Sequence, residues 1–381
     1  MAALIGFIFG AFVGSFLNVC VHRLPRNESV VNPPSRCYAC GTHVQWYDNL
    51  PVVSWLLLWG RCRWCGTTFS PRYLFLELLV AGITAAVVGW AFTATSASSP
   101  WLLAAGVTEP IARAVAGAAV LALVYFLLVS SLIDLDHMII PDELTKGFQF
   151  AAPFLAVLAG TNLMLPDLLD PGAWLWRQDV YGNRTTNVIP FAVVIGSAVL
   201  GSIVLLIASL PLARWIYGRL LPEAQRWGEA DHHGFRRGVQ VFCAALALSG
   251  GALAMVVALR PSDWWAPLAV QGALAVLGLI AGWMSLYLVG LIGTVVFARN
   301  AMGFGDVKFL APIGAFLGPV GVLYAFFVAA ILGTVLGLPM RLLASKREIP
   351  FGPYLALGAV VVMFFGTDLH RLLFTVLLAP R

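Results

Sequence analysis

The chain has 381 residues, of which 60% are hydrophobic and 11% are charged, and its mean hydropathy is +0.88. A soluble domain carries about 25% charged residues, so this composition excludes an ordinary globular enzyme, a disordered chain and a fibrous protein. It predicts a polytopic membrane protein. In such a protein the net charge of +5 indicates topology, and we expect no nucleic-acid partner.

The predicted fold is all-α, with about ten membrane segments of roughly the length needed to cross a bilayer. The first lacks a charged start and an obvious cleavage site, so we expect a retained helix and no cleaved signal peptide. The eighth is short and is expected to be a half-helix packed against its neighbours. No internal repeat is apparent. The segments run over residues 4–21, 72–92, 112–133, 145–160, 188–213, 238–259, 266–297, 308–318, 320–340 and 350–366.

Basic residues predict the orientation. Arg and Lys gather in the loops 22–72, 214–237 and 341–349, whereas the loop 93–111 has none. Because cytoplasmic loops are enriched in Arg and Lys, the N-terminus is predicted to lie outside and the three basic loops in the cytoplasm.

Four cysteines stand in the first basic loop, as Cys37-Tyr-Ala-Cys40 and Cys62-Arg-Trp-Cys65. Two such pairs can close one tetrahedral Zn²⁺ site, and the predicted reducing side favours a metal over two disulfides or unrelated thiols. Four thiolates leave no open coordination position, so the zinc is expected to be structural. A loop of this size holds little core, and a metal would stabilise it.

A first acidic motif ends the third apolar segment and contains Asp134, Asp136, Pro141 and Asp142. Carboxylates beside hydrocarbon are costly and are usually functional. Pro141 and Asp142 predict a helix break followed by a new helix start. The structural alternative is a solvated helix end.

A second motif places Gly303 and Gly305 just before Asp306 and Lys308, at the start of another apolar segment. Glycine permits close backbone approach. The alternative is a helix cap, with Asp306 facing the helix dipole and Lys308 extending to the membrane surface.

Both motifs fall at predicted cytoplasmic boundaries, although 306 − 134 = 172 residues separate Asp134 from Asp306. Two carboxylates held close together cannot both ionise easily, so the pair shares a proton. Such a pair can act on a water molecule, with one member as base and the other as acid.

At these motifs the chain resembles the type IV prepilin peptidases, membrane aspartic proteases of the GxGD type. The first acidic motif and the GxGD motif match the two catalytic motifs of that family. Several further motifs appear in the family's order, and the resemblance covers most of the chain except its middle. The matching stretches are 14–25, 33–37, 46–54, 60–65, 70–77, 133–142, 303–308 and 349–353.

The resemblance implies that Asp134 and Asp306 are catalytic. Asp136 is the rival of Asp134, which is preferred because it stands seven residues before Pro141. Gly303 and Gly305 would admit an extended substrate. Asp136, Asp142 and Glu143 would attract a basic leader, the alternative being that they are only hydrated, and Lys308 would support the site.

The family cuts the leader from prepilins or pseudopilins on the cytoplasmic side of the bacterial inner membrane. It then methylates the new N-terminus with S-adenosylmethionine, an activity that the resemblance assigns to the cysteine-bearing region. The apparatus served would be a type IV pilus, a type II secretion system or a DNA-uptake machine, and the sequence does not distinguish them.

The expected organisation is a first membrane helix, a cytoplasmic zinc domain, a membrane core with the first catalytic Asp, an insertion with an extra helical pair, and a core with the GxGD motif. The insertion departs from the family, in which the two Asp motifs are usually closer. A helical pair returns the chain to the same face, so the Asp geometry can survive. The boundaries are 1–21, 22–72, 73–160, 161–265 and 266–381.

Two rival functions use the same residues. In a proton- or cation-coupled transporter, Asp134 and Asp306 would form a relay, and the zinc site would belong to a docking module. In a structural or assembly protein, the acids would only cap helices. Relay acids usually lie near the membrane centre, whereas these fall at one face.

Overall fold

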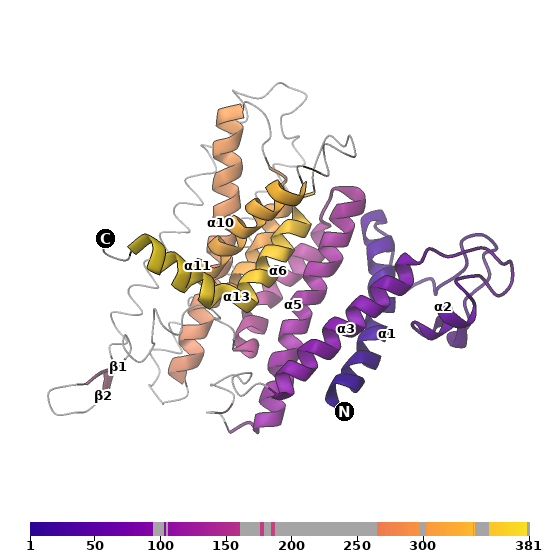
Figure 1. Ribbon diagram of the computed structural model, residues 1–381, viewed down its shortest axis with the longest axis horizontal. Helices are drawn as coiled ribbons and strands as arrows, with labels where there is room; N and C mark the ends of the chain where they lie inside the picture. The colour runs from indigo at the N-terminus through magenta and orange to yellow at the C-terminus, as the bar shows by residue number, and fades with distance from the viewer. Residues whose placement is uncertain are drawn as a thin grey trace.

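The structure is a computed structural model that describes residues 1–93, 103, 106–160, 176–178, 184–186, 265–297, 302–337, 339 and 350–378. The predicted segments 188–213 and 238–259, and most of the predicted insertion, lie outside these residues. The described part is a bundle of helices from which residues 22–72 project at one end (Figure 1).

Eight helices are described: α1 (Ala2–Arg23), α2 (Val53–Leu57), α3 (Arg72–Thr93), α5 (Glu109–His137), α6 (Asp142–Ala159), α10 (Trp265–Phe297), α11 (Phe304–Leu332) and α13 (Gly352–Leu378). Short 3₁₀ turns η1 (Leu24–Arg26) and η2 (Trp46–Asn49) and a π turn η4 (Gly333–Gly337) accompany them. A small antiparallel pair, β1 (Trp176–Gln178) and β2 (Arg184–Thr186), sets Trp176 opposite Thr186. The other described elements are all helical, in agreement with the all-α expectation.

Five described helical stretches are long and apolar enough to cross a membrane. They are Ala2–Arg26, Arg72–Phe92, Glu109–His137, Leu274–Phe297 and Phe304–Gly337. The chain is therefore a multi-pass membrane protein, and the count of ten segments stays a prediction. The predicted eighth and ninth segments form one element, α11, whose helical dihedrals break at Gly318 (φ 73°, ψ 175°), directly before Pro319.

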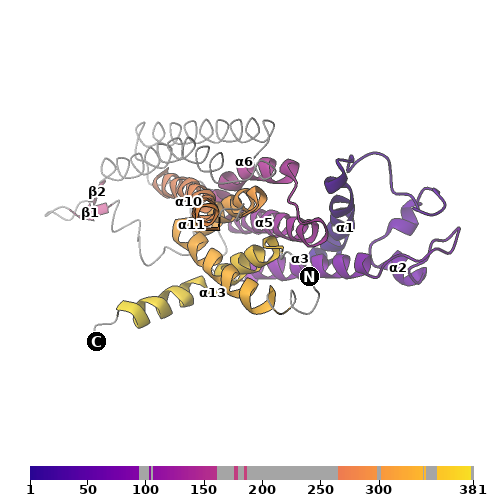
Figure 2. The ribbon, with the colours of Figure 1, turned by 90° about the horizontal axis from the view of Figure 1, so that it is seen from above.

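The helices form two groups that meet at α5. On one side α1 and α3 run antiparallel, and Gly6, Gly10 and Gly14 bring α1 close to the backbone of α3. On the other side α11 packs against α10, α6 and α13. Figures 1 and 2 show α5 between the α1–α3 pair and this second group.

The packing core has two parts that follow this division. The larger joins α5, α6, α10, α11 and α13, and the smaller joins α1, α3 and α5. Where α10 crosses α11, a methyl group on Gly278 or Gly314 would overlap the backbone of the other helix. Small residues allow such close approach between membrane helices.

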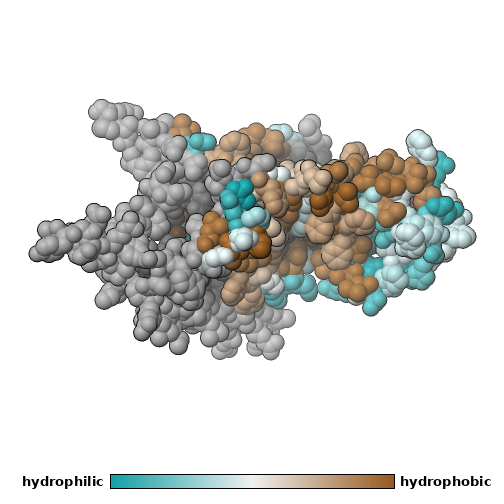
Figure 3. All heavy atoms as spheres, turned by 90° about the horizontal axis from the view of Figure 1, so that it is seen from below, coloured by the Kyte–Doolittle hydropathy of each residue, from teal (hydrophilic) through white to brown (hydrophobic). Residues whose placement is uncertain are grey.

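The outside of the bundle is largely apolar. Large side chains such as Phe9 (58% exposed), Ile292 (61%) and Phe327 (60%) point outward. Figure 3 shows hydrophobic side chains over the described helices, and hydrophilic ones most often at the end that holds residues 22–72. An apolar surface of this extent marks a membrane interface.

Candidate active site and metal centre

Asp134 lies in the last turn of α5, which ends where Met138 takes a left-handed conformation (φ 55°). Asp134 is buried, with only 5% of the residue exposed. The backbone N–H of Gly352, at the start of α13, donates a hydrogen bond of 2.9 Å to Asp134 Oδ2. This contact joins residues 218 positions apart in the chain. A Cβ atom at position 352 would stand 2.8 Å from the same oxygen, so this approach requires glycine.

Asp306 lies in the first turn of α11, which begins after Gly303 in extended conformation. Its backbone N–H donates to Gly303 O (3.2 Å), and a Cβ atom at Gly303 would stand 3.5 Å from Asp306 Oδ2. Gly305 lies against Ile140, in the link between α5 and α6. At Gly303, by contrast, the lack of a side chain leaves the Asp306 carboxylate uncovered on that side.

The fold brings the two acidic motifs together. The ion pair between Lys308 and Asp142 and the approach of Gly305 to Ile140 join residues of the second motif to residues of the first. Asp134 is fourth from the end of α5 and Asp306 is third from the start of α11. Both carboxylates therefore lie at helix ends, on two helices that contact each other.

Lys308 and Asp142 form an ion pair between α11 and α6. Lys146 also pairs with Asp142 (2.7 Å), and Gln149 Nε2 donates to the backbone oxygen of Lys308 (2.8 Å). Pro141 directly precedes α6, as the predicted break and restart requires. Lys308 therefore fixes the start of α11 against α6, whereas the alternative had its side chain extending to the membrane surface.

Asp136 points to a different partner. It forms an ion pair of 2.7 Å with Arg72, the first residue of α3. Asp136 thus joins α5 to the helix that follows the cysteine region, whereas Asp134 bonds to α13. This difference separates the two residues that compete for the first catalytic position.

The four cysteines of the first loop form one cluster. Their Sγ atoms all lie within 4.8 Å of one another, and those of Cys37 and Cys65 are 3.7 Å apart. Zn–S bonds of about 2.3 Å in a tetrahedron place sulfurs about 3.8 Å apart. None of the four is in a disulfide. The cluster therefore fits a single metal ion ligated by Cys37, Cys40, Cys62 and Cys65.

Each cysteine pair sits on the same kind of turn. Cys37 N–H donates to Thr42 O and Cys62 N–H donates to Thr67 O, each at 2.9 Å, and the glycine after each pair has a positive φ of 71° or 72°. Hydrogen bonding to Thr67 lowers the pKa of Cys65 to about 6, which favours the thiolate that a metal needs. The two turns repeat an Arg-Cys-x-x-Cys-Gly-Thr pattern. The sequence reading missed this repeat.

Two further contacts fasten the cysteine region. Arg63 Nε donates to Asp48 Oδ2 (2.8 Å), and the guanidinium holds the pKa of the Asp48 carboxyl below its usual range. Glu77 of α3 is 8% exposed, and its Oε2 accepts a hydrogen bond of 2.7 Å from the N–H of Val52. Glu77 therefore anchors the loop to the membrane helices.

The sequence motifs also missed one residue of the site. Gly352 stands inside the closing motif at 349–353, but only the fold shows its bond to Asp134. A glycine between Phe351 and Pro353 was the available signal.

Comparisons with known proteins agree with these motifs. The family model described as "Bacterial Peptidase A24 N-terminal domain" matches residues 8–92, and the one described as "Type IV leader peptidase family" matches residues 242–338. The first range holds all four cysteines and the second holds Asp306. Asp134 falls between them.

Several relatives carry the name "Prepilin leader peptidase/N-methyltransferase". That of Stutzerimonas stutzeri is 25% identical over 389 residues, which cover 95% of this chain and 90% of the relative. That of Pseudomonas aeruginosa is 25% identical over 391 residues, covering 96% and 90%. That of Myxococcus xanthus is 37% identical over 159 residues, 41% of each chain. No solved structure matches this chain.

The bundle of apolar helices with its acidic pair and these matches define a membrane-embedded peptidase. Residues 8–92 and 242–338 match the two domain models of the type IV leader peptidase family, and a relative named prepilin leader peptidase aligns with 95% of the chain, so the chain is similar to that family over most of its length.

Proposed function

We propose that the protein is an aspartic endopeptidase that removes the leader from type IV prepilins or pseudopilins, with Asp134 and Asp306 as its catalytic pair. The observation that carries this proposal is the contact between the two acidic motifs, in which Lys308 pairs with Asp142 and Gly305 lies against Ile140, although Asp134 and Asp306 stand 172 residues apart (306 − 134). The names of the relatives supply the substrate class.

The chemistry follows from one proton shared by the pair. The ionised carboxylate takes a proton from a water molecule, whose oxygen attacks the carbonyl carbon of the scissile peptide. The protonated carboxyl donates a hydrogen bond to the carbonyl oxygen, and a proton passes to the leaving amine as the C–N bond breaks. The N–H of Gly352 donates to Oδ2 of Asp134 and so holds that carboxylate in place.

The contacts of the acidic residues revise their expected roles. Asp136 is paired with Arg72, and Asp142 with Lys146 and Lys308, so both act within the fold. Glu143, beside Asp142, is exposed. We assign the attraction of the basic leader to Glu143.

The active site is proposed to face the cytoplasm from the bacterial inner membrane. Arg23 at the end of α1 and Arg72 at the start of α3 belong to the most basic loop, and Arg72 contacts Asp136 at the Asp134 end of α5. The positive-inside rule then assigns that end of the bundle to the cytoplasm. The domain boundaries 1–21, 22–72, 73–160, 161–265 and 266–381 belong to the same proposal.

We further propose that residues 22–72 hold a structural Zn²⁺ on the four cysteines and serve N-methylation of the new N-terminus. S-adenosylmethionine would supply the methyl group when bound. The chain's own contribution is to hold the loop in place, because Asp48–Arg63 ties η2 to the second cysteine turn and Glu77 ties Val52 to α3.

The deciding experiment is cleavage of a synthetic prepilin by the purified protein. Asp134→Asn and Asp306→Asn should each lower the cleavage rate by about 10²-fold or more, the usual contribution of a general acid or base. Asp136→Asn is the matched control and should cut at nearly the normal rate. Each variant should still methylate a pilin that has already been cut, which shows that it is folded. Full cleavage by Asp306→Asn would refute the proposal.

A further inference from the structure

An uncharged apolar stretch interrupts the polar first loop. Residues 50–60 contain no charged side chain, although Asp48 and Arg61 stand close on either side. The stretch includes α2, and four large side chains point outward: Val53 is 50% exposed, Leu56 54%, Leu57 75% and Trp59 82%. In contact with water these side chains would lose the free energy that burial gives apolar surface.

The inner side of this stretch is fixed to the protein. Ser54 is 8% exposed, and its hydroxyl donates to Tyr47 O at 2.9 Å. Gly60 N–H donates to Trp55 O at 2.9 Å and packs on the Trp55 ring. These bonds hold α2 within the loop, and the hydrogen bond from Val52 to Glu77 ties the loop to α3.

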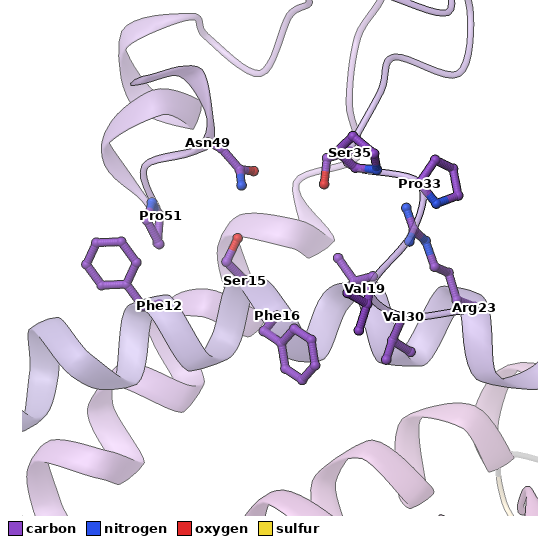
Figure 4. A pocket seen from close by; sticks show the side chains of 12 residues that line it. Phe12, Ser15, Phe16, Val19, Arg23, Val30, Pro33, Ser35, Asn49 and Pro51 are labelled. Carbon is purple, nitrogen blue, oxygen red and sulfur yellow. The ribbon is translucent and has the colours of Figure 1, made fainter. Parts of the chain in front are cut away.

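The stretch begins beside α1, at a point several residues before Arg23, which marks the polar end of that helix. A pocket runs along α1 from Phe12 to Arg23, and Figure 4 shows Pro51 next to Phe12 and Asn49 above Ser15. Ser15 is 23 − 15 = 8 residues before Arg23, which is about 12 Å at the helical rise. The start of α2 is thus displaced along α1 toward its apolar part.

A hydrogen bond supports this placement independently. Val52, which directly precedes α2, donates to Glu77, five residues inside α3. The first residue of α3, Arg72, pairs with Asp136 at the polar end of α5. Val52 is therefore held about 8 Å farther along α3 than this ion pair.

These positions reach the depth of lipid. The polar layer on each side of a bilayer is roughly 5–8 Å thick, half the difference between a total of about 40–45 Å and a core of about 30 Å. The outward face of α1 near this point, with Phe12 (53% exposed) and Phe16 (50%), is itself apolar. The exposed side of α2 is next to that lipid-facing surface.

We propose that residues 50–60 form an interfacial element whose outward side chains insert into the boundary between lipid headgroups and acyl chains. The occupant of this surface is the bilayer that the helices cross. Trp59 suits the position because indole rings concentrate at membrane interfaces. The cysteine region then lies against the membrane, and this inference is independent of the proposed function.

The test uses the full-length protein in phospholipid nanodiscs. A photo-crosslinking amino acid replaces Leu57 in one variant and Tyr38 in a control, since Tyr38 is equally exposed (73%) but stands on the first cysteine turn. Mass spectrometry should find phospholipid adducts several-fold more often at position 57. Equal adduct yields at the two positions, or adducts only with protein, would overturn the proposal.

A second measurement does not depend on crosslinking. Acyl chains brominated near the headgroup quench indole fluorescence in contact with them. Trp59→Phe should reduce the quenched part of the protein's emission, whereas Trp64→Phe, on the second cysteine turn, should leave it unchanged. A Trp59→Phe protein quenched like the wild type contradicts the proposal. Neither readout requires cleavage, so the peptidase proposal is tested separately.

Discussion

The cysteine region and the acidic pair achieve order in different ways. Within residues 22–72 few side chains are buried, and the structure depends on short turns, the four thiols and a few polar contacts. Asp134 and Asp306 instead depend on α5, α11 and α13, which pack through a large apolar core. The four cysteines are close in sequence, so a metal bound to them would order the loop by itself. The two carboxylates are far apart in sequence and are positioned only when the helices of the bundle have packed.

Metal removal gives the largest expected separation of the two regions. Structural zinc contributes about 10–16 kcal/mol to the folding of small domains, so Cys37→Ser should abolish stoichiometric metal and methyl transfer. Cleavage should persist, because the core around α5 and α11 does not use the cluster. Metal analysis and both activity assays measure this.

Cys20→Ala is the control for that experiment, because Cys20 is buried in α1 outside the cluster. It should retain metal. If the Cys37→Ser protein bound metal and methylated normally, the cysteine region would not depend on the four-cysteine cluster, and the proposed difference between the two regions would be wrong.

Gly352→Ala tests the acidic pair from the side of α13. The added methyl group would meet Asp134 Oδ2 and displace the N–H that bonds to it. A hydrogen bond to a charged group is worth about 1.5–3 kcal/mol, so kcat/KM for cleavage should fall by about 10- to 150-fold. Methyl transfer to a pre-cut pilin should not change.

Leu357→Ala is the matched control on α13, since Leu357 is 47% exposed. It should cut at nearly the normal rate. Equal activity of Gly352→Ala and Leu357→Ala would show that the amide does not position Asp134.

Asp142→Asn should have a smaller effect. It removes the carboxylate beside Lys308, whose side chain is 16% exposed, but Asp142 itself is 41% exposed and partly screened. We expect the loss of this ion pair to cost about 1 kcal/mol of interaction free energy, which would lower the cleavage rate roughly fivefold. Lys146→Gln, which changes only the exposed partner, should have almost no effect. A larger loss in Lys146→Gln would be the contrary result.

Glu143→Gln should produce the smallest change. If this exposed carboxylate attracts the leader, KM for a basic prepilin should rise by no more than about threefold while kcat stays constant. The difference should vanish at 1 M salt, where charges are screened within about 3 Å. A KM difference that survives high salt would argue against an electrostatic role.

Sequence patterns were most informative where function is local. The paired cysteines at positions 37, 40, 62 and 65 predicted one cluster, and the structure confirms that their thiols gather. The break at Pro141 and the interruption between the eighth and ninth segments also appear, at the start of α6 and at Gly318. Each depends on residues within a few positions of one another.

Tertiary contacts were beyond those patterns. Gly352 stands inside the closing motif at 349–353, but its hydrogen bond to Asp134 could not be predicted from that motif, because the two residues are 218 positions apart. The same reason explains Asp136 and Asp142, whose charges suggested leader binding until their partners Arg72 and Lys308 were seen. The count of ten membrane segments depends on residues that the structure does not describe.

The position of α5 between two cores has a consequence for the order of membrane insertion. Thr84 of α3 is fully buried, and its hydroxyl already donates to Val80 O (2.6 Å) within the same helix. The α1–α3 pair can therefore enter the bilayer before the rest of the chain is made. The Tyr125 hydroxyl of α5 forms a hydrogen bond of 2.7 Å with the Thr84 hydroxyl, and this bond requires α5 to pack against the α1–α3 pair. The N-terminal hairpin would then provide a surface on which α5 can pack.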